Sequence, residues 1–439
     1  MEVKGFNRNS IIVRLLMIGI LILVLMIPTV MINGLIGERS IRKAEAVAEI
    51  TSKWAQAQTV GGPVITIPYE RSFKDDQGKV RTEMDYAQFL PEELGIEGKI
   101  RPEIRYRGIY KAAVYNLKLK LAGRFSFAKL ERLNLNPERI HWNEAFMAVQ
   151  ITDMRGIKDS VGLIWGGRQF RFEPGIFEGG IFTSGISLRI PLNTISAQEG
   201  SAFSINLNLN GSEELSLQPL GQTTTVQLSS TWNSPSFTGA FLPETRRVDK
   251  NGFNARWKVL DLNRNYPQQW VGDAYNDNLK GSEFGVKLFS PVDEYTQVNR
   301  AVKYIFMFVG LTFLVFFLVE VFNKRKIHPV QYLLIGLSLC IFYVLLLSLS
   351  EHINFQLAYL IAGISIIGLI GAYVRSALGG KWVTLLTAGL LVALYGYLYI
   401  LLQNQDYALL MGSIGVFIIM AIVMYISRNI DWYKIEMKD

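Results

Sequence analysis

The chain has 439 residues, of which 50% are hydrophobic, and its formal net charge is +8 with a pI near 9.3. A basic chain can be a nucleic-acid-binding protein, but no stripe of Lys and Arg interleaved with aromatic residues occurs, so we expect no nucleic-acid partner. The single cysteine, Cys340, lies in an apolar run. Any exported part of the chain therefore folds without a disulfide and depends on a hydrophobic core.

The N-terminus predicts a membrane anchor. Lys4, Arg8 and Arg14 precede the apolar run Leu15–Ile36. A cleaved signal peptide is the alternative, but its apolar region has about 7–15 residues and ends in a small-residue cleavage site. This run is longer and continues into Gly37-Glu38-Arg39. We predict a cytoplasmic segment at 1–10 and an uncleaved transmembrane helix at 11–36, and on either interpretation the segment after residue 36 is exported.

The segment Glu38–Gln58 has apolar residues at helical spacing and holds no Gly or Pro, which predicts an amphipathic helix that continues from the first span. Gly61-Gly62-Pro63 is expected to end it. One interpretation is a stalk packed on the exported domain, and the other is a membrane-lying or partner-binding helix. We favour the stalk, because the negatively charged glutamates of this segment would weaken its binding to anionic lipid.

Beyond the stalk, the apolar period changes from helical to alternating. The segments Tyr115–Leu121, Phe203–Leu209 and Phe284–Leu288 each alternate apolar and polar residues. Such alternation predicts strands with one buried and one solvated face, so we expect an antiparallel, sandwich-like β-rich domain within 37–300, with the stalk at its start. A glycine cluster at Pro174–Gly185 suggests a division of this domain into two halves.

The last third of the chain is a series of apolar runs, each long enough to span a bilayer as a helix. The predicted transmembrane helices are 301–322, 329–350, 355–374, 382–402 and 407–427, with a tail at 428–439. Lys324, Arg325, Lys326, Arg375 and Lys381 lie in alternate connectors, and the connectors between those contain no Lys or Arg. By the positive-inside rule, both termini are expected in the cytoplasm and residues 37–300 outside it. The predicted fold class is an α+β membrane protein.

The sequence contains no motif that predicts catalysis. The exported region has one histidine, His141, and lacks HExxH, paired CxxC, GxSxG, Walker and dinucleotide-binding patterns. We therefore predict no catalytic residue, no metal and no cofactor. Asp153 and Arg155 are interpreted as an ion-paired turn, in which the arginine lowers the pKa of the aspartate.

Two sets of residues are candidates for function. Glu351 and His352 end the helix predicted at 329–350, where they could sense pH or contact the exported domain; a hydrated helix end is the alternative. Trp232, Phe237 and Phe241 lie close together in the exported region and form either an exposed binding surface or a plug in the core, which we favour.

The apolar helices themselves predict a packed bundle. Glu320 ends the helix predicted at 301–322, where Lys324 and Arg325 could neutralise it. Gly363, Gly368 and Gly371 could allow close approach of helices. These features do not indicate a charged pore.

Several long blocks resemble the CreD family of inner-membrane, cell-envelope integrity proteins. They are collinear and cover essentially the whole chain: Gly62–Pro68, Arg155-Gly156, Trp232–Pro243 (WNSPSFTGAFLP), His328–His352 (HPVQYLLIGLSLCIFYVLLLSLSEH) and Arg428–Tyr433 (RNIDWY). The resemblance implies an inner membrane protein with a large periplasmic domain, linked to envelope homeostasis and, in some members, to colicin tolerance. The family has no established catalytic residues, so the resemblance assigns none to this chain.

We therefore expect a non-enzymatic envelope integrity protein of the inner membrane that acts through binding by its periplasmic domain. Its expected partners are the lipid bilayer together with envelope proteins, lipids or cell-wall components. A transporter or lipid-handling protein, in which the helix bundle moves a substrate, is the alternative. A hydrolase built around His141 is a third hypothesis, and it requires a convergent catalytic triad.

Overall fold

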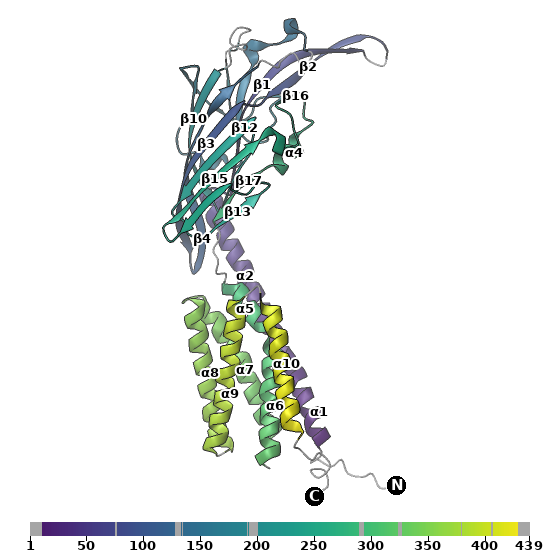
Figure 1. Ribbon diagram of the computed structural model, residues 1–439, viewed down its shortest axis with the longest axis vertical. Coiled ribbons are helices and arrows are strands. Elements are labelled where there is room, and N and C mark those ends of the chain that lie inside the picture. The colour runs from purple at the N-terminus through teal and green to yellow at the C-terminus, as the bar shows by residue number, and fades with distance from the viewer. Residues whose placement is uncertain are drawn as a thin grey trace. The chain divides into compact units, whose positions relative to one another are not determined.

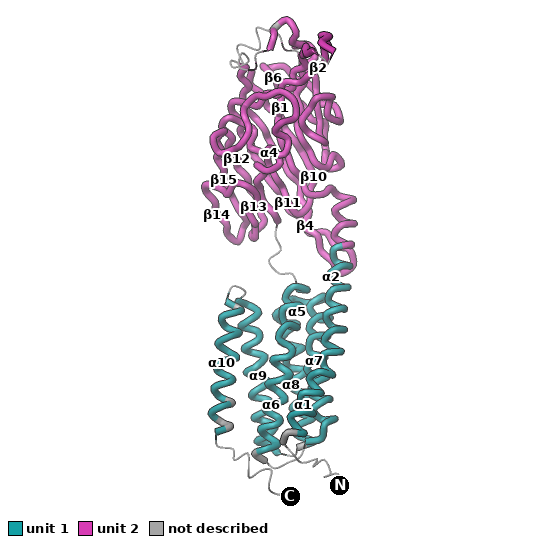
Figure 2. Tube along the Cα trace, turned by 90° about the vertical axis from the view of Figure 1, so that its right-hand side faces the viewer, with its two compact units in different colours: residues 1–44, 292–439 teal, residues 45–291 magenta. Residues whose placement is uncertain are grey.

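The computed structural model describes residues 11–74, 77–127, 133, 135–190, 192, 201–288, 294–323, 327–378, 380–404 and 407–428. The chain forms two compact units (Figure 2). The membrane unit comprises residues 1–44 and 292–439, and the β unit comprises residues 45–291. The predicted N-terminal segment 1–10, the basic connector at Lys324–Lys326 and all but Arg428 of the tail lie outside the described residues.

The chain begins with a long helix that is interrupted only at Leu25. Its two parts are α1 (Ile11–Val24) and α2 (Met26–Trp54). Together they form one long helix, of which the candidate membrane span and its extension, Val13–Trp54, make up 42 residues. Pro28 lies three residues after this interruption and has no N–H to donate to the Val24 carbonyl, while the bonds Leu25 N–H to Leu21 O and Thr29 N–H to Leu25 O continue the helix on either side. The helix ends at Trp54, so the prediction that Gly61-Gly62-Pro63 ends it is wrong. These three residues lie inside strand β1, where backbone pairing determines their conformation.

Apolar helices make up the rest of the membrane unit. They are α5 (Glu294–Lys303), α6 (Ile305–Asn323), α7 (Pro329–Ser350), α8 (Phe355–Leu378), α9 (Lys381–Gln403) and α10 (Ala408–Ser427). By length and composition, the described residues contain four helices that could cross a membrane, including the N-terminal one, or up to five if α5 and α6, bent by 44°, form one span. Leu409–Ile422 within α10 is a shorter apolar stretch. The predicted α+β membrane fold is confirmed.

The β unit consists of two sheets (Figure 1). The first sheet has the order β13-β17-β11-β1-β5-β9-β8, with β2 paired to β1 and β16 paired to β2. Its strands are β1 (Gln58–Lys74), β2 (Val80–Phe89), β5 (Phe146–Ile151), β8 (Glu173–Pro174), β9 (Gly185–Arg189), β11 (Glu214–Leu217), β13 (Pro235–Gly239), β16 (Gln269–Val271) and β17 (Phe284–Leu288). The short helix α4 (Asn276–Gly281) precedes β17.

The second sheet has the order β14-β15-β12-β3-β4-β10-β6-β7. Its strands are β3 (Glu93–Arg107), β4 (Tyr110–Phe125), β6 (Gly162–Trp165), β7 (Arg168–Arg171), β10 (Ser201–Ser212), β12 (Thr223–Ser230), β14 (Thr245–Asp249) and β15 (Gly252–Leu260). Most neighbours are antiparallel, as predicted, but β1 pairs with β11 and β12 pairs with β3 in parallel. Both sheets are therefore mixed.

One hydrophobic core joins the two sheets. Leu117 and Leu121 of β4 and Ile65 of β1 belong to the same buried cluster, and the rings of Trp257 and Phe284, one from each sheet, lie 5.7 Å apart. The predicted sandwich is confirmed. The suggested division at Pro174–Gly185 is wrong, because β9 after this segment pairs with β5 before it and residues 45–291 form one compact unit.

The last turns of α2 pack on the hairpin of β3 and β4. Glu49 forms an ion pair with Arg107, and the Trp54 indole N–H donates a hydrogen bond to the Tyr115 carbonyl at 3.4 Å. The Arg105 guanidinium lies 4.6 Å from the centroid of the Trp54 ring. These contacts support the interpretation of this segment as a stalk packed on its own domain.

Candidate functional site

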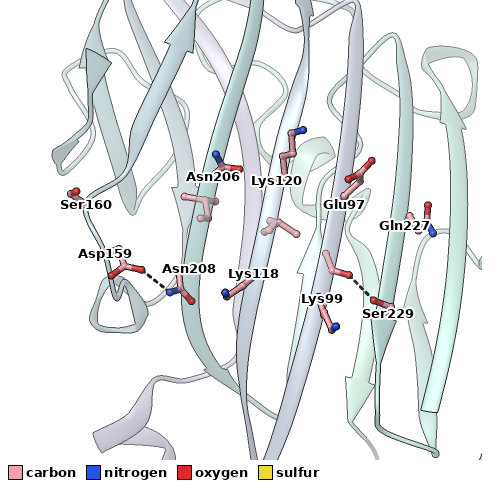
Figure 3. A pocket seen from close by; sticks show the side chains of 13 residues that line it. Glu97, Lys99, Lys118, Lys120, Asp159, Ser160, Asn206, Asn208, Gln227 and Ser229 are labelled. Atoms are coloured by element: carbon pink, nitrogen blue, oxygen red, sulfur yellow. Dashed lines mark hydrogen bonds between the residues drawn. The ribbon is translucent and has the colours of Figure 1, made fainter. Parts of the chain in front are cut away.

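A polar groove crosses the outer face of the second sheet, with a volume of about 700 Å³ (Figure 3). Strict alternation creates this face. Leu117, Leu119 and Leu121 of β4 turn into the core, so Lys118 and Lys120 between them project to the other side. Strands β12, β3, β4 and β10 each contribute side chains to the groove.

Cross-strand register arranges these side chains in two rows. One row contains Ser229, Lys99, Lys118 and Asn208, which are direct partners on β12, β3, β4 and β10. The other row contains Gln227, Glu97, Lys120 and Asn206 on the same strands. Asp159 extends the first row, because its carboxylate accepts a hydrogen bond of 2.6 Å from the Asn208 amide. The groove therefore presents alternating charges, amides and hydroxyls.

The pairing of Lys99 with Lys118 is electrostatically unfavourable. Like charges directly opposite each other on neighbouring strands destabilise a sheet. Both lysines are exposed, and neither they nor Lys120 form a hydrogen bond or ion pair with other residues in the described part of the chain. Their ammonium groups are available to an external anion.

Further cations continue this face beyond the groove. Arg101 is opposite Asn116 on the hairpin of β3 and β4, while Arg256 and Lys258 of β15 are opposite Gln227 and Thr225 of β12. All three basic side chains are exposed. The lining itself consists mainly of amines, amides, hydroxyls and two carboxylates, a set suited to binding by charge and hydrogen bonds. Among the described residues, no group of His, Cys, Asp or Glu could hold a metal ion.

The comparisons with known proteins establish the family. The family model described as inner membrane protein CreD matches residues 10–433. This chain belongs to the CreD family. The inner membrane protein CreD of Escherichia coli (strain K12) is 33% identical over 422 residues, which cover 95% of this chain and 92% of that protein. The match places the protein in the inner membrane, in agreement with its apolar helices.

In this CreD-family chain, Glu351 and His352 do not form a pair. The Glu351 carboxylate accepts a hydrogen bond of 2.8 Å from the Tyr295 hydroxyl and lies 3.8 Å from the Arg39 guanidinium. Lys43 lies over the Tyr295 ring, 5.5 Å from its centroid. His352 is exposed, and its backbone N–H bonds to the Leu349 carbonyl. The Glu351 carboxylate therefore links the end of α7 to α2 and α5.

Trp232, Phe237 and Phe241 are half-buried against the core of the β unit. The Phe237 ring packs edge-on against Phe253 and Trp257, with centroids 5.8 and 5.7 Å away. Phe241 packs in the same way on Phe284 at 5.8 Å. These contacts favour the plug over the exposed binding surface.

Glu320 lies at the end of α6, as predicted, but its partner is different. Its carboxylate forms an ion pair of 2.8 Å with Arg14 of α1, and the predicted partners Lys324 and Arg325 lie outside the described residues. The glycines that allow close packing also differ from the prediction. A Cβ added at Gly363, Gly368 or Gly371 would meet nothing within 4 Å, whereas one at Gly336 would collide with the Leu25 side chain.

The remaining groups considered in the β unit, Asp153, Arg155 and His141, each lie beside a residue of opposite charge or a carboxylate. The Arg155 guanidinium donates two hydrogen bonds to Asp153, of 2.9 and 2.7 Å, which confirms the predicted ion-paired turn. This pairing lowers the pKa of Asp153 to about 2. The ring nitrogens of His141 face the carboxylates of Glu70 and Glu144, at 3.4 and 3.7 Å. Both neighbours are carboxylates, and neither is the serine, threonine or cysteine nucleophile of the triad that the third hypothesis requires.

Sequence reasoning did not find the groove. The alternation of Lys118 and Lys120 with apolar residues, and of Asn206 and Asn208 on β10, indicates by itself only a solvated face. The missing information is the register, which brings Lys99 opposite Lys118 and gives the face its row of adjacent cations.

Proposed function

We propose that this CreD-family protein is a non-enzymatic component of cell-envelope integrity whose β unit binds an envelope component in the groove of the second sheet. The membrane unit anchors the chain in the inner membrane. The basic residues at alternate ends of the apolar helices support an extracytoplasmic position for the β unit, by the positive-inside rule. Tolerance to colicins, to which the family is linked, would result from the same envelope role.

One observation carries this proposal: a large groove lined with binding groups but without a catalytic arrangement. Lys99, Lys118 and Lys120 face solvent on a rigid sheet, and rigid strands hold a binding site more precisely than loops do. The groove does not favour the lipid-handling alternative. Its apolar members, Leu119 and Leu207, are buried in the core, so the groove exposes no large apolar side chain to an acyl chain.

The test is complementation of a deletion strain whose envelope has become permeable to a dye that intact cells exclude. The groove variant is K99Q/K118Q/K120Q. The matched control is K111Q/K250Q/K280Q, which removes three exposed lysines outside the groove and changes the net charge equally. We expect the control, but not the groove variant, to restore exclusion of the dye at equal protein levels. Full restoration by the groove variant would contradict the proposal.

In-cell photocrosslinking locates the contact. A photoreactive residue at Gln227 lies in the groove, and one at Asn251 lies in the turn between β14 and β15. Capture of an envelope component from Gln227 but not from Asn251 supports binding in the groove. Equal capture from both positions, or capture from neither, contradicts it.

A further inference from the structure

We propose that the ligand of the groove is a strand of an anionic polysaccharide that carries carboxylates. This inference deepens the proposed function and rests on it. The juxtaposed cations indicate the sign of the ligand's charge. Lys99 and Lys118 repel each other in the free protein, and an anion between them would replace this repulsion with two attractive contacts.

The dimensions of the site favour a polymer. The groove runs across β12, β3, β4 and β10, and three steps between neighbouring strands span about 14 Å at about 4.8 Å a step. Arg256 and Lys258 extend the cationic face beyond β12. A small anion would occupy only the pair of lysines, whereas an extended chain would also reach the amides on both sides.

The chemistry of the lining favours hydroxyls with spaced carboxylates. Gln227, Asn206 and Asn208 can donate to and accept from sugar hydroxyls, and Glu97 can accept from them. The two carboxylates of the lining, Glu97 and Asp159, would repel the double charge of a phosphate monoester more strongly than the single charge of a carboxylate. The groove also lacks the guanidinium forks that suit phosphate, because its cations are lysines.

Other polymers fit this lining less well. No aromatic side chain lines the groove, so neither the bases of a single-stranded nucleic acid nor the rings of a neutral sugar have a surface for stacking. A neutral glycan would also leave the repulsion between the adjacent lysines uncompensated, because it carries no negative charge. A carboxylated polysaccharide uses the ammonium groups, the amides and the carboxylates together.

The experiment uses the full chain in nanodiscs of phosphatidylcholine and measures the fluorescence anisotropy of labelled polygalacturonate, with labelled dextran as the neutral probe. We expect polygalacturonate but not dextran to bind. The variant K99Q/K118Q/K120Q should weaken binding about tenfold or more, since it removes charge-assisted hydrogen bonds. The charge-retaining K99R/K118R/K120R should recover most of the binding that the glutamine variant loses, and the control K111Q/K250Q/K280Q should bind nearly as the native protein does.

Other results would overturn the inference in distinguishable ways. Equal binding of dextran would indicate a neutral glycan. Lysine-dependent binding of phosphatidylglycerol vesicles without binding of polygalacturonate would indicate a lipid headgroup. An equal loss in the control would indicate nonspecific attraction. If polygalacturonate fails to bind while crosslinking from Gln227 still captures an envelope component, the ligand class is wrong and the proposed function stands. If complementation and crosslinking fail as well, the proposed function is also wrong.

Discussion

Arg14 and Glu320 form an ion pair within the membrane unit, with Nη1 2.8 Å from Oε1 although 306 positions separate them. The Glu320 side chain is 3% exposed, and it also accepts hydrogen bonds from the Tyr332 hydroxyl and the Ile327 N–H, each 3.2 Å long. A buried carboxylate is tolerated when it is paired and its other acceptor sites are used. This cluster joins α1 to α6 and α7.

A second ion pair joins the same N-terminal helix to the bundle at its other end. Arg39 of α2 lies 3.8 Å from Glu351 at the end of α7. Arg14 and Arg39 are 25 positions apart (39 minus 14), which is about 38 Å along a helix and exceeds the hydrocarbon thickness of about 30 Å. The two ion pairs therefore lie at opposite ends of the apolar part of this helix.

Glu320→Ala should destabilise the membrane unit by about 3 kcal/mol, because it removes the carboxylate that Arg14, Tyr332 and Ile327 share. The measurement is the thermal midpoint of the detergent-solubilised chain. The control is R14M/E320L, which replaces both charges by apolar groups and should recover most of the loss. If Glu320→Ala leaves the midpoint unchanged, the ion pair does not contribute to stability.

Tyr295→Phe should cost about 1 kcal/mol, since it removes one hydrogen bond to Glu351 and keeps the ring beneath Lys43. We expect faster proteolysis in the region of α5, measured with a soluble protease on the purified protein. Tyr399→Phe is the matched control, because no hydrogen bond of the Tyr399 hydroxyl occurs in the described part of the chain. Equal proteolysis of the two variants would contradict a role for the Tyr295 hydroxyl.

Asp153→Asn should destabilise the β unit at neutral pH and have little effect in acid. The folded pKa of Asp153, about 2, is below its ordinary value of 3.8, so the carboxylate stabilises the fold above about pH 4. This contribution is lost as the pH falls through about 2. We expect a loss of about 1–2 kcal/mol at pH 7, less than the shift alone implies, because the Arg155 side chain is 59% exposed.

Tryptophan fluorescence can monitor this unfolding, since six of the eight tryptophans lie in residues 45–291. The difference between Asp153→Asn and the native protein should narrow steadily from pH 7 towards pH 2. A difference that stays constant over this range would show that the ion pair is not its source.

Lys118→Gln should stabilise the β unit slightly, by about 0.2–1 kcal/mol, because it removes the like-charge contact with Lys99. Salt screens exposed charges, so the gain should be largest at low ionic strength. Lys111→Gln, outside the groove, is the control and should change stability little. A gain in stability together with weaker binding of polygalacturonate would show that Lys118 serves binding. A loss of stability would contradict this assignment.

The helices were predictable because apolar length is a local property of the chain. Helix α7 has the same bounds, Pro329–Ser350, as the apolar helix predicted from the sequence. The strands were predictable for a similar reason, since alternation shows directly which face of β4 or β10 enters the core. Local patterns thus indicated both the membrane helices and the sandwich.

The groove and the ion pairs depend on contacts between distant parts of the chain. Gln227 lies opposite Glu97 because β12 pairs in parallel with β3. The amino-acid pattern of a strand does not indicate which distant strand it pairs with in this way. Glu320 pairs with Arg14, which is 306 positions away in the sequence, whereas the predicted partners, Lys324 and Arg325, are nearby in the sequence. Register and packing between distant segments therefore require the structure.

Phe237→Ala tests whether the aromatic residues of Trp232–Pro243 are core or binding surface. Phe237 packs edge-on against Phe253 and Trp257, so its loss should cost about 2–3 kcal/mol, slightly less than for a fully buried ring. Leu242→Ala is the control within the same segment. Leu242 is 69% exposed, and its truncation should change the free energy of unfolding by less than about 0.5 kcal/mol.

Thermal unfolding and complementation should be measured on both variants. If Phe237 is core, Phe237→Ala lowers the unfolding midpoint, and any loss of dye exclusion is recovered when cells grow at low temperature, where the variant stays folded. If Phe237→Ala leaves the midpoint unchanged and abolishes complementation at every temperature, the aromatic cluster is itself a binding surface. The second result would move the contact with the envelope from the groove to β13, because ring packing would then have no measurable role in stability.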